Sequence, residues 1–150
     1  MPDLRELYQE VILDHTKNPR NFHVLDDATA KATGNNPLCG DRVTVYLKMD
    51  GDRIVDASFQ GQGCAISKSS ASLMTDTVKG RTKAEAEALF DRFHEMITGQ
   101  AVSSADPKVL GKLAVFQGVS EFPLRVKCAS LAWHTLKSAL ELKEGVVTLE

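Results

Sequence analysis

The stretch CGDRVTVYLKMDGDRIVDASFQGQGC, residues 39–64, decides the fold, because it predicts two strands joined by a tight turn. Apolar and polar residues alternate over residues 41–50, which is typical of a strand with one buried face. Asp50-Gly51 is a hairpin turn signal, and the alternation resumes over residues 53–60. The stretch therefore predicts a two-stranded antiparallel hairpin.

The same hairpin predicts that several possible metal ligands lie together. Because the turn folds the second strand back on the first, Cys64 returns to the end of the sheet where Cys39 and Asp41 begin. A third cysteine, Cys128, is far away in the sequence. Three cysteines cannot all pair and are too few for a disulfide framework, which favours metal binding or thiol chemistry. The alternative is that each cysteine is a small buried hydrophobic residue.

The rest of the chain predicts one more strand and several helices with an apolar face. Thr82 to Glu85 have the form of a capping box, and Pro123 is tolerated in the first turn of the last helix. The expected helices span residues 3–16, 65–79, 82–99 and 122–140, and a weak strand signal covers residues 28–35. The predicted fold class is α+β, with a small antiparallel sheet of about three strands packed against several helices.

Composition is that of one globular domain. The chain has 150 residues, of which 43% are hydrophobic and 25% charged, so it can bury a core without a metal. The net charge is -2, and basic and acidic residues are interspersed along the chain. The sequence therefore lacks the cluster of Lys and Arg that is typical of nucleic-acid-binding proteins, and we expect no nucleic-acid partner. No apolar run approaches the length of a membrane span, and the first residues lack a signal-peptide pattern. We therefore expect a cytoplasmic protein with no membrane partner.

Four side chains have the chemistry of a zinc site. Zinc in proteins is usually four-coordinate and takes thiolate, imidazole or carboxylate ligands. The start of a helix favours the thiolate form of a cysteine, and two of the cysteines fall at or near predicted helix starts. The candidate ligands are Cys39, Asp41, Cys64 and Cys128. Their spacing is by itself a weak signal, because they are single residues on separate elements rather than a pair of Cys-x-x-Cys motifs.

Two basic residues near the last cysteine are candidates for electrostatic support of this site. Divalent zinc with three thiolates and one carboxylate sums to a charge of -2, and Arg125 and Lys127 are positioned to offset that excess. The alternatives are that Asp41 is an ordinary turn residue and that Arg125 and Lys127 belong to a solvated helix face. None of the four histidines is a good ligand candidate.

Three motifs resemble those of the IscU/NifU N-terminal superfamily, and most closely those of its SufU branch. The motifs are Cys39-Gly40-Asp41, the heptapeptide Gly61 to Ser67, and the decapeptide Arg125 to His134. They occur in order, with the ligand types intact, and the resemblance covers nearly the whole chain. It implies a single SufU/IscU-like domain over residues 1–150 with a SufE/IscU-like fold.

Two departures distinguish the branches of this superfamily. IscU scaffolds carry a Leu-Pro-Pro-Val-Lys chaperone motif and a histidine before the third cysteine, whereas this chain has Glu121 to Arg125 and Lys127 at those places. The region near residues 80–112, which contains an additional helix, looks like the insertion that separates SufU proteins from IscU scaffolds. Both departures favour the SufU branch.

The SufU resemblance implies a zinc-dependent sulfurtransferase. Such a protein accepts persulfide sulfur from a SufS-type cysteine desulfurase and passes it to downstream iron-sulfur assembly proteins. The resemblance places zinc on the residues matching Cys39, Asp41, Cys64 and Cys128.

Loop placement favours Cys39 as the sulfur acceptor. It lies between Pro37 and Gly40, and it can leave a metal at a smaller conformational cost than a helix-bound thiol, then react as a thiolate. One alternative is a scaffold on which an iron-sulfur cluster is built at the same four residues. Another is a structural zinc module that only docks a partner.

Overall fold

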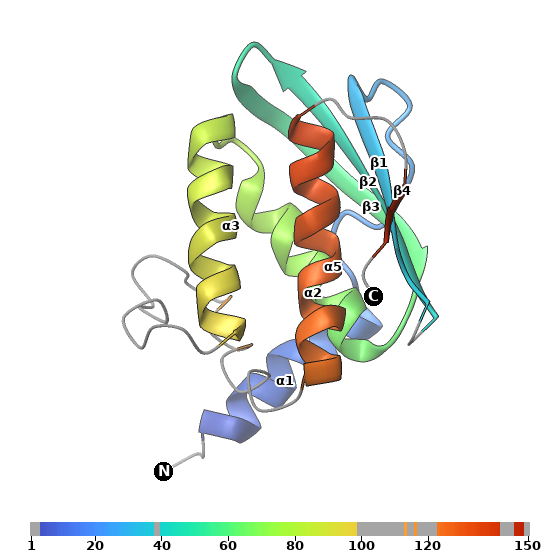
Figure 1. Cartoon of the computed structure of the whole chain (residues 1–150), viewed down its shortest axis with the longest axis vertical. Helices are drawn as coiled ribbons and strands as arrows, with labels where there is room; N and C mark the ends of the chain where they lie inside the picture. The colour runs from blue at the N-terminus through green and yellow to red at the C-terminus, as the bar shows by residue number, and fades with distance from the viewer. Residues whose placement is uncertain are drawn as a thin grey trace.

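The computed structural model of the chain describes residues 4–37, 40–98, 113, 116, 123–141 and 146–148. Figure 1 shows its helices and strands. In chain order they are α1 (Leu4–Lys17), β1 (Ala30–Asn36), β2 (Asp41–Asp50), β3 (Arg53–Gln62), α2 (Ala65–Val78), α3 (Lys83–Ile97), α5 (Pro123–Leu140) and β4 (Val146–Thr148). The predicted α+β class is confirmed.

The sheet has the strand order β3-β2-β1-β4. Strands β1, β2 and β3 are antiparallel neighbours. The pairing of β2 with β3 is the hairpin that the alternating pattern predicts. The short strand β4 is an addition to the expected sheet and pairs parallel with β1. In the hairpin Asp50 pairs with Arg53 at one end and Arg42 with Gln62 at the other. The residues after β3 therefore lie beside the start of β2.

Helices α2, α3 and α5 lie on one side of the sheet, and α1 lies at the end where α2 and α5 begin (Figure 1). Helix α5 packs on β1 and β2, and α2 packs on β3, α1 and α5. The contact between α5 and β1 is close at Gly34, where an added Cβ would lie 2.0 Å from Thr135 Oγ1. This close packing holds the middle of α5 against β1, about two helical turns after Cys128.

Strand β2 points alternate side chains into the core. Its buried row begins with Asp41 and continues with Val43, Val45 and Leu47, each at most 3% exposed. The carboxylate of Asp41 is thus the polar end of an otherwise apolar row.

An aromatic contact joins two of the helices. Trp133 of α5 stacks on Phe93 of α3 with ring centroids 4.8 Å apart.

The helix boundaries follow local signals. The capping box of Thr82 and Glu85 forms as predicted at the start of α3. After α2 the chain turns at Gly80, whose φ of 80° lies in the region that glycine favours. The proposed insertion near residues 80–112 is described only as far as residue 98, and its status as an insertion stays a prediction. Among the helices of the described segments, none combines the length and apolar character needed to cross a membrane.

Candidate metal centre

Asp41, Cys64 and Cys128 converge at one end of the sheet. Their ligand atoms all lie within 4.8 Å of one another, although the residues come from the start of β2, the N-cap of α2 and the second turn of α5. The expectation that the hairpin returns Cys64 to Asp41 is met by this geometry. Their role as metal ligands stays a prediction.

Cys39, the fourth expected ligand, lies outside the described residues, as does Leu38. The flanking positions are described: Asn36 pairs with Asp41 across β1 and β2, and Gly40 has a φ of 71°. That Cys39 completes the set stays a prediction.

The carboxylate of Asp41 is held in place by the residues before α2. Asp41 is 0% exposed, and its Oδ1 atom accepts a hydrogen bond of 2.9 Å from the backbone N–H of Cys64. An added Cβ on Gly63 would lie 2.6 Å from this oxygen, so only glycine leaves room for the carboxylate there. A buried carboxylate is costly unless a cation or several hydrogen bonds offset its charge. The position therefore favours a bound cation.

The spacing of the three candidate ligand atoms is close to that of a zinc site. The Cys64 Sγ atom lies 3.9 Å from Asp41 Oδ2. In a tetrahedral zinc site, ligand atoms at ordinary bond lengths are separated by about 3.6 to 3.8 Å. Small side-chain rotations would close the difference. Two sulfur atoms with one carboxylate oxygen suit zinc, and they also suit iron.

The two sulfur atoms differ in exposure. Cys64 is exposed, and its Sγ atom accepts a hydrogen bond of 3.5 Å from the backbone N–H of Ser67 in the first turn of α2. Cys128 is 4% exposed.

Arg125 and Lys127 lie on α5 just before Cys128. The side chain of Arg125 is exposed and that of Lys127 is half-buried. Their electrostatic support of the centre stays a prediction.

Comparison with known families places most of this chain in one family. The profile described as "NifU-like N terminal domain" matches residues 7–141. The chain belongs to the NifU-like N-terminal domain family.

Curated relatives of this NifU-like domain fall in both branches that the motifs suggested. The "Zinc-dependent sulfurtransferase SufU" of Bacillus subtilis is 44% identical over 143 residues, which cover 95% of each chain. The "Iron-sulfur cluster assembly scaffold protein IscU" of Streptococcus pyogenes is 45% identical over 138 residues, which cover 92% of this chain and 85% of that one. The resemblance to the IscU/NifU superfamily, including SufU, is confirmed.

A solved structure supports the fold of the NifU-like domain. The protein comes from Fervidobacterium islandicum, and its description assigns it to iron-sulfur cluster assembly in the SUF system. It superposes with a TM-score of 0.83 at 39% identity, covering 91% of this chain and 98% of that chain.

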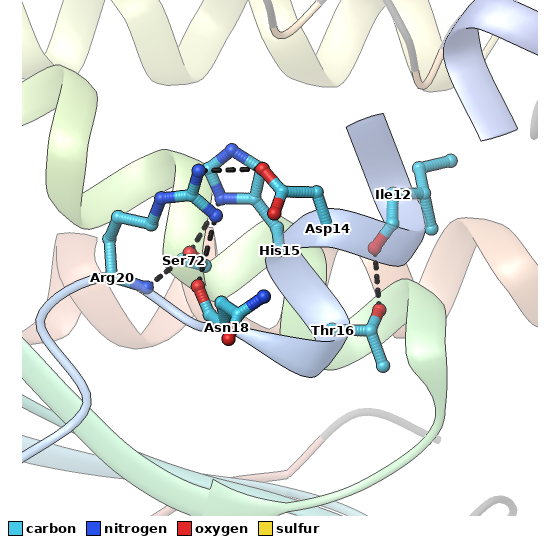
Figure 2. A network of polar contacts seen from close by, with 7 residues as sticks. All are labelled: Ile12, Asp14, His15, Thr16, Asn18, Arg20 and Ser72. Carbon is cyan, nitrogen blue, oxygen red and sulfur yellow. Dashed lines mark hydrogen bonds and ion pairs between the residues drawn. The ribbon is translucent and has the colours of Figure 1, made fainter. Parts of the chain in front are cut away.

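A polar network, missed by sequence reasoning, ties α1 to the helix that carries Cys64 (Figure 2). Nδ1 of the buried His15 lies 2.7 Å from Ser72 Oγ, and the backbone N–H of Arg20 donates to the same oxygen at 2.8 Å. Thr16 Oγ1 also donates to the carbonyl of Ala65, the residue after Cys64, at 3.3 Å. These contacts join residues 49 to 57 positions apart, and no local pattern in the sequence signals them.

Proposed function

We propose that this chain is a zinc-dependent sulfurtransferase that accepts persulfide sulfur from a SufS-type cysteine desulfurase. It relays the sulfur to downstream iron-sulfur cluster assembly proteins. The observation that carries the proposal is the convergence of Asp41, Cys64 and Cys128 within 4.8 Å, in a chain closely related to a zinc-dependent sulfurtransferase. We also propose a cytoplasmic location, where a reducing environment keeps the cysteines as thiols.

Zinc would be held by Asp41, Cys64 and Cys128, with Cys39 as the fourth ligand. Cys39 is two residues from Asp41, so their Cα atoms are at most about 7.6 Å apart. Bound zinc would supply the positive charge that keeps these thiols deprotonated near neutral pH. Arg125 and Lys127 would offset part of the negative charge of the ligand set.

Cys39 is the proposed sulfur acceptor, because contacts within the fold hold the sulfur atoms of the other two cysteines. The sulfur of Cys64 accepts an N–H from the first turn of α2, and Cys128 is 4% exposed. The Cys39 thiolate attacks the terminal sulfur of the desulfurase persulfide, and the sulfur–sulfur bond of the donor breaks. The desulfurase cysteine leaves as a thiolate and Cys39 becomes the persulfide, so two negative charges are present before and after the step.

Peptide mass spectrometry tests this proposal. The zinc-loaded chain is incubated with the desulfurase and cysteine, free thiols are blocked, and each cysteine-containing peptide is weighed. We expect one added sulfur on the Cys39 peptide, and no sulfur uptake or desulfurase stimulation by Cys39→Ala. Full stimulation by Cys39→Ala, or sulfur found first on Cys64 or Cys128, would contradict the assignment of Cys39.

A second candidate function is a scaffold that assembles an iron-sulfur cluster on the same residues. The relative from Streptococcus pyogenes is named as such a scaffold, and thiolates bind iron as well as zinc. Anaerobic reconstitution followed by transfer to an apo-ferredoxin separates the two functions. A stable, transferable cluster would favour the scaffold, and failure to retain a cluster would favour the sulfurtransferase.

A further inference from the structure

Helix α2 is enclosed on all sides over about two turns. Residues 69–75 are all buried, and the helix packs on β3, α1 and α5. Because each residue of an α-helix advances by about 100° around its axis, such a run covers every face of the helix. Buried hydroxyls are nearly always hydrogen-bonded, so the serines inside this run need partners within the protein. The run therefore has polar contacts with more than one neighbour.

Three buried serines in this run have different partners. The hydroxyl of Ser69 bonds carbonyls of α2 itself, and that of Ser72 contacts His15 of α1. Ser70 Oγ donates to the carbonyl of Ala129 in α5 at 2.6 Å. Both Ser70 and Ala129 are 0% exposed, and they lie 59 positions apart in the sequence. Ser70 thus joins α2 to α5 by a hydrogen bond that no solvent reaches.

This hydrogen bond lies close to two of the candidate ligands. Ala129 directly follows Cys128 in α5, and Ser70 follows Cys64, the N-cap of α2, by about 9 Å along the helix axis. The sulfur atoms of the two cysteines lie within 4.8 Å of each other. Since an α-helix moves largely as one unit, a bond that fixes Ala129 against α2 also fixes Cys128 relative to Cys64.

The Ser70 bond is an addition to the helical bonds of α5. A helical carbonyl accepts the N–H four residues later and keeps a second lone pair, which the hydroxyl of Ser70 uses. Without this hydroxyl the Ala129 carbonyl keeps its helical partner, and alanine is the best helix former. We therefore expect Ser70→Ala to fold, while α5 loses a fixed point on α2.

We propose that Ser70 is a positioning residue, which keeps the sulfur atoms of Cys64 and Cys128 paired through its bond to α5. The inference rests on the proposed sulfurtransferase function and adds the contact that separates the holding ligands from the reacting one. Two cysteines on joined helices stay together, and Cys39, which neither helix carries, is the thiolate that leaves to take the sulfur. Without the bond the pair spreads apart, and Cys64, which is exposed, competes with Cys39 for sulfur.

Disulfide exchange measures this positioning without a metal. In a Cys39→Ala background only Cys64 and Cys128 remain, and their effective concentration follows from the equilibrium of the metal-free chain with reduced and oxidised glutathione. We expect Ser70→Ala to lower this effective concentration about tenfold. Ser69→Ala is the matched control, because it removes an equally buried hydroxyl whose bonds stay within α2. Equal effective concentrations in the two variants would overturn the proposal, even if Ser70→Ala were less stable.

Two further measurements connect this positioning to the metal and to the reaction. We expect Ser70→Ala to bind zinc about tenfold more weakly than Ser69→Ala, and its cobalt-loaded form to show a changed visible absorption spectrum. After incubation with persulfidated desulfurase, Ser70→Ala should carry sulfur on Cys64 as well as Cys39. Unchanged zinc affinity and an unchanged cobalt spectrum would overturn the proposal. If the wild-type chain accepts no sulfur while Ser70→Ala still lowers the effective concentration, the proposed function fails and the positioning role stands.

Discussion

Asp41 is the residue on which the candidate centre depends most directly. Its carboxylate is fully buried, accepts the N–H of Cys64, and lies 3.9 Å from the Cys64 sulfur. It therefore orients the Cys64 amide, and it is the proposed oxygen ligand of the centre.

We expect Asp41→Ala to lose zinc at least tenfold faster than the wild-type chain, because it loses a ligand and leaves the Cys64 amide without its acceptor. Metal content after a timed chelator challenge measures this. Asp41→Asn is the matched control, because it keeps an oxygen near the Cys64 amide without the charge. Its rate of zinc loss should fall between those of the wild-type chain and Asp41→Ala. Unchanged retention in Asp41→Ala would count against ligation by the carboxylate.

His134 is the residue whose titration should affect stability. Its ring packs between α3 and α5, 5.1 Å from the Phe90 ring and 5.6 Å from the His94 ring. Burial lowers the pKa of His134 below its ordinary value of 6.5, and the charges of His94 and Lys137 act in the same direction. The unfolded chain therefore binds this proton at a higher pH than the folded chain does.

The lowered pKa of His134 determines how the stability of the folded chain changes with pH. Above pH 6.5 His134 is neutral in both states, and below it the unfolded state gains the proton first, so stability falls as the pH falls. We expect urea unfolding of His134→Gln to show a smaller loss of stability across this range than that of the wild-type chain. His23→Gln, which changes an exposed histidine, is the control and should keep the wild-type decline. An undiminished decline in His134→Gln would contradict the prediction.

At the scale of elements, the attachment of α1 to α2 positions Cys64. Ser72 Oγ contacts Nδ1 of His15 and accepts the N–H of Arg20, so one hydroxyl joins three segments (Figure 2). Asp14 adds an ion pair with Arg20, and their hydrogen bond lowers the pKa of the Asp14 carboxyl. The ion pair is exposed, so the buried hydroxyl carries most of the effect.

We expect Ser72→Ala to lower the free energy of unfolding by about 1–3 kcal/mol, because a buried ring nitrogen and a backbone amide lose their partner. Urea denaturation measures the change. Ser69→Ala is the matched control: Ser69 is equally buried on the same helix, but its hydroxyl bonds only carbonyls of α2 itself. Ser69→Ala should lose less stability than Ser72→Ala. Equal losses would show that the contact of Ser72 with α1 adds no stability beyond that of a hydrogen bond within α2.

The elements also show why the sequence predicts some features and not others. The hairpin and the N-cap at Cys64 depend on local signals, namely strand alternation, the Asp50-Gly51 turn and the start of an apolar helix pattern. Strand β4 has only three residues and forms because β1 offers a free edge to a distant segment. The Ser72 network likewise depends on packing between remote segments. The return of Cys64 to Asp41 was therefore predictable from local signals, while the contacts that support these residues were not.

At the scale of the whole molecule, one apolar core supports the centre without including it. The core joins the buried row of β2 to α2, α3 and α5, with Phe59, Phe93 and Trp133 among its largest buried side chains. A core of this extent can hold the fold together without a metal.

We expect removal of zinc by a chelator to lower the midpoint of thermal unfolding while leaving the helical circular dichroism spectrum essentially unchanged. The metal-free chain should still unfold cooperatively, because metal binding adds to stability rather than creating it. Collapse of the helical signal on chelation would instead favour a structural zinc module, whose folding depends on its metal.

The central claim is a sulfur relay that requires zinc at Asp41, Cys64 and Cys128 together with Cys39. The most direct test is the turnover of the cysteine desulfurase, measured with the zinc-loaded, the iron-loaded and the metal-free chain at equal concentrations. The account predicts that only the zinc-loaded chain stimulates turnover. Equal stimulation by the metal-free chain, or stimulation by the iron-loaded chain alone, would contradict it.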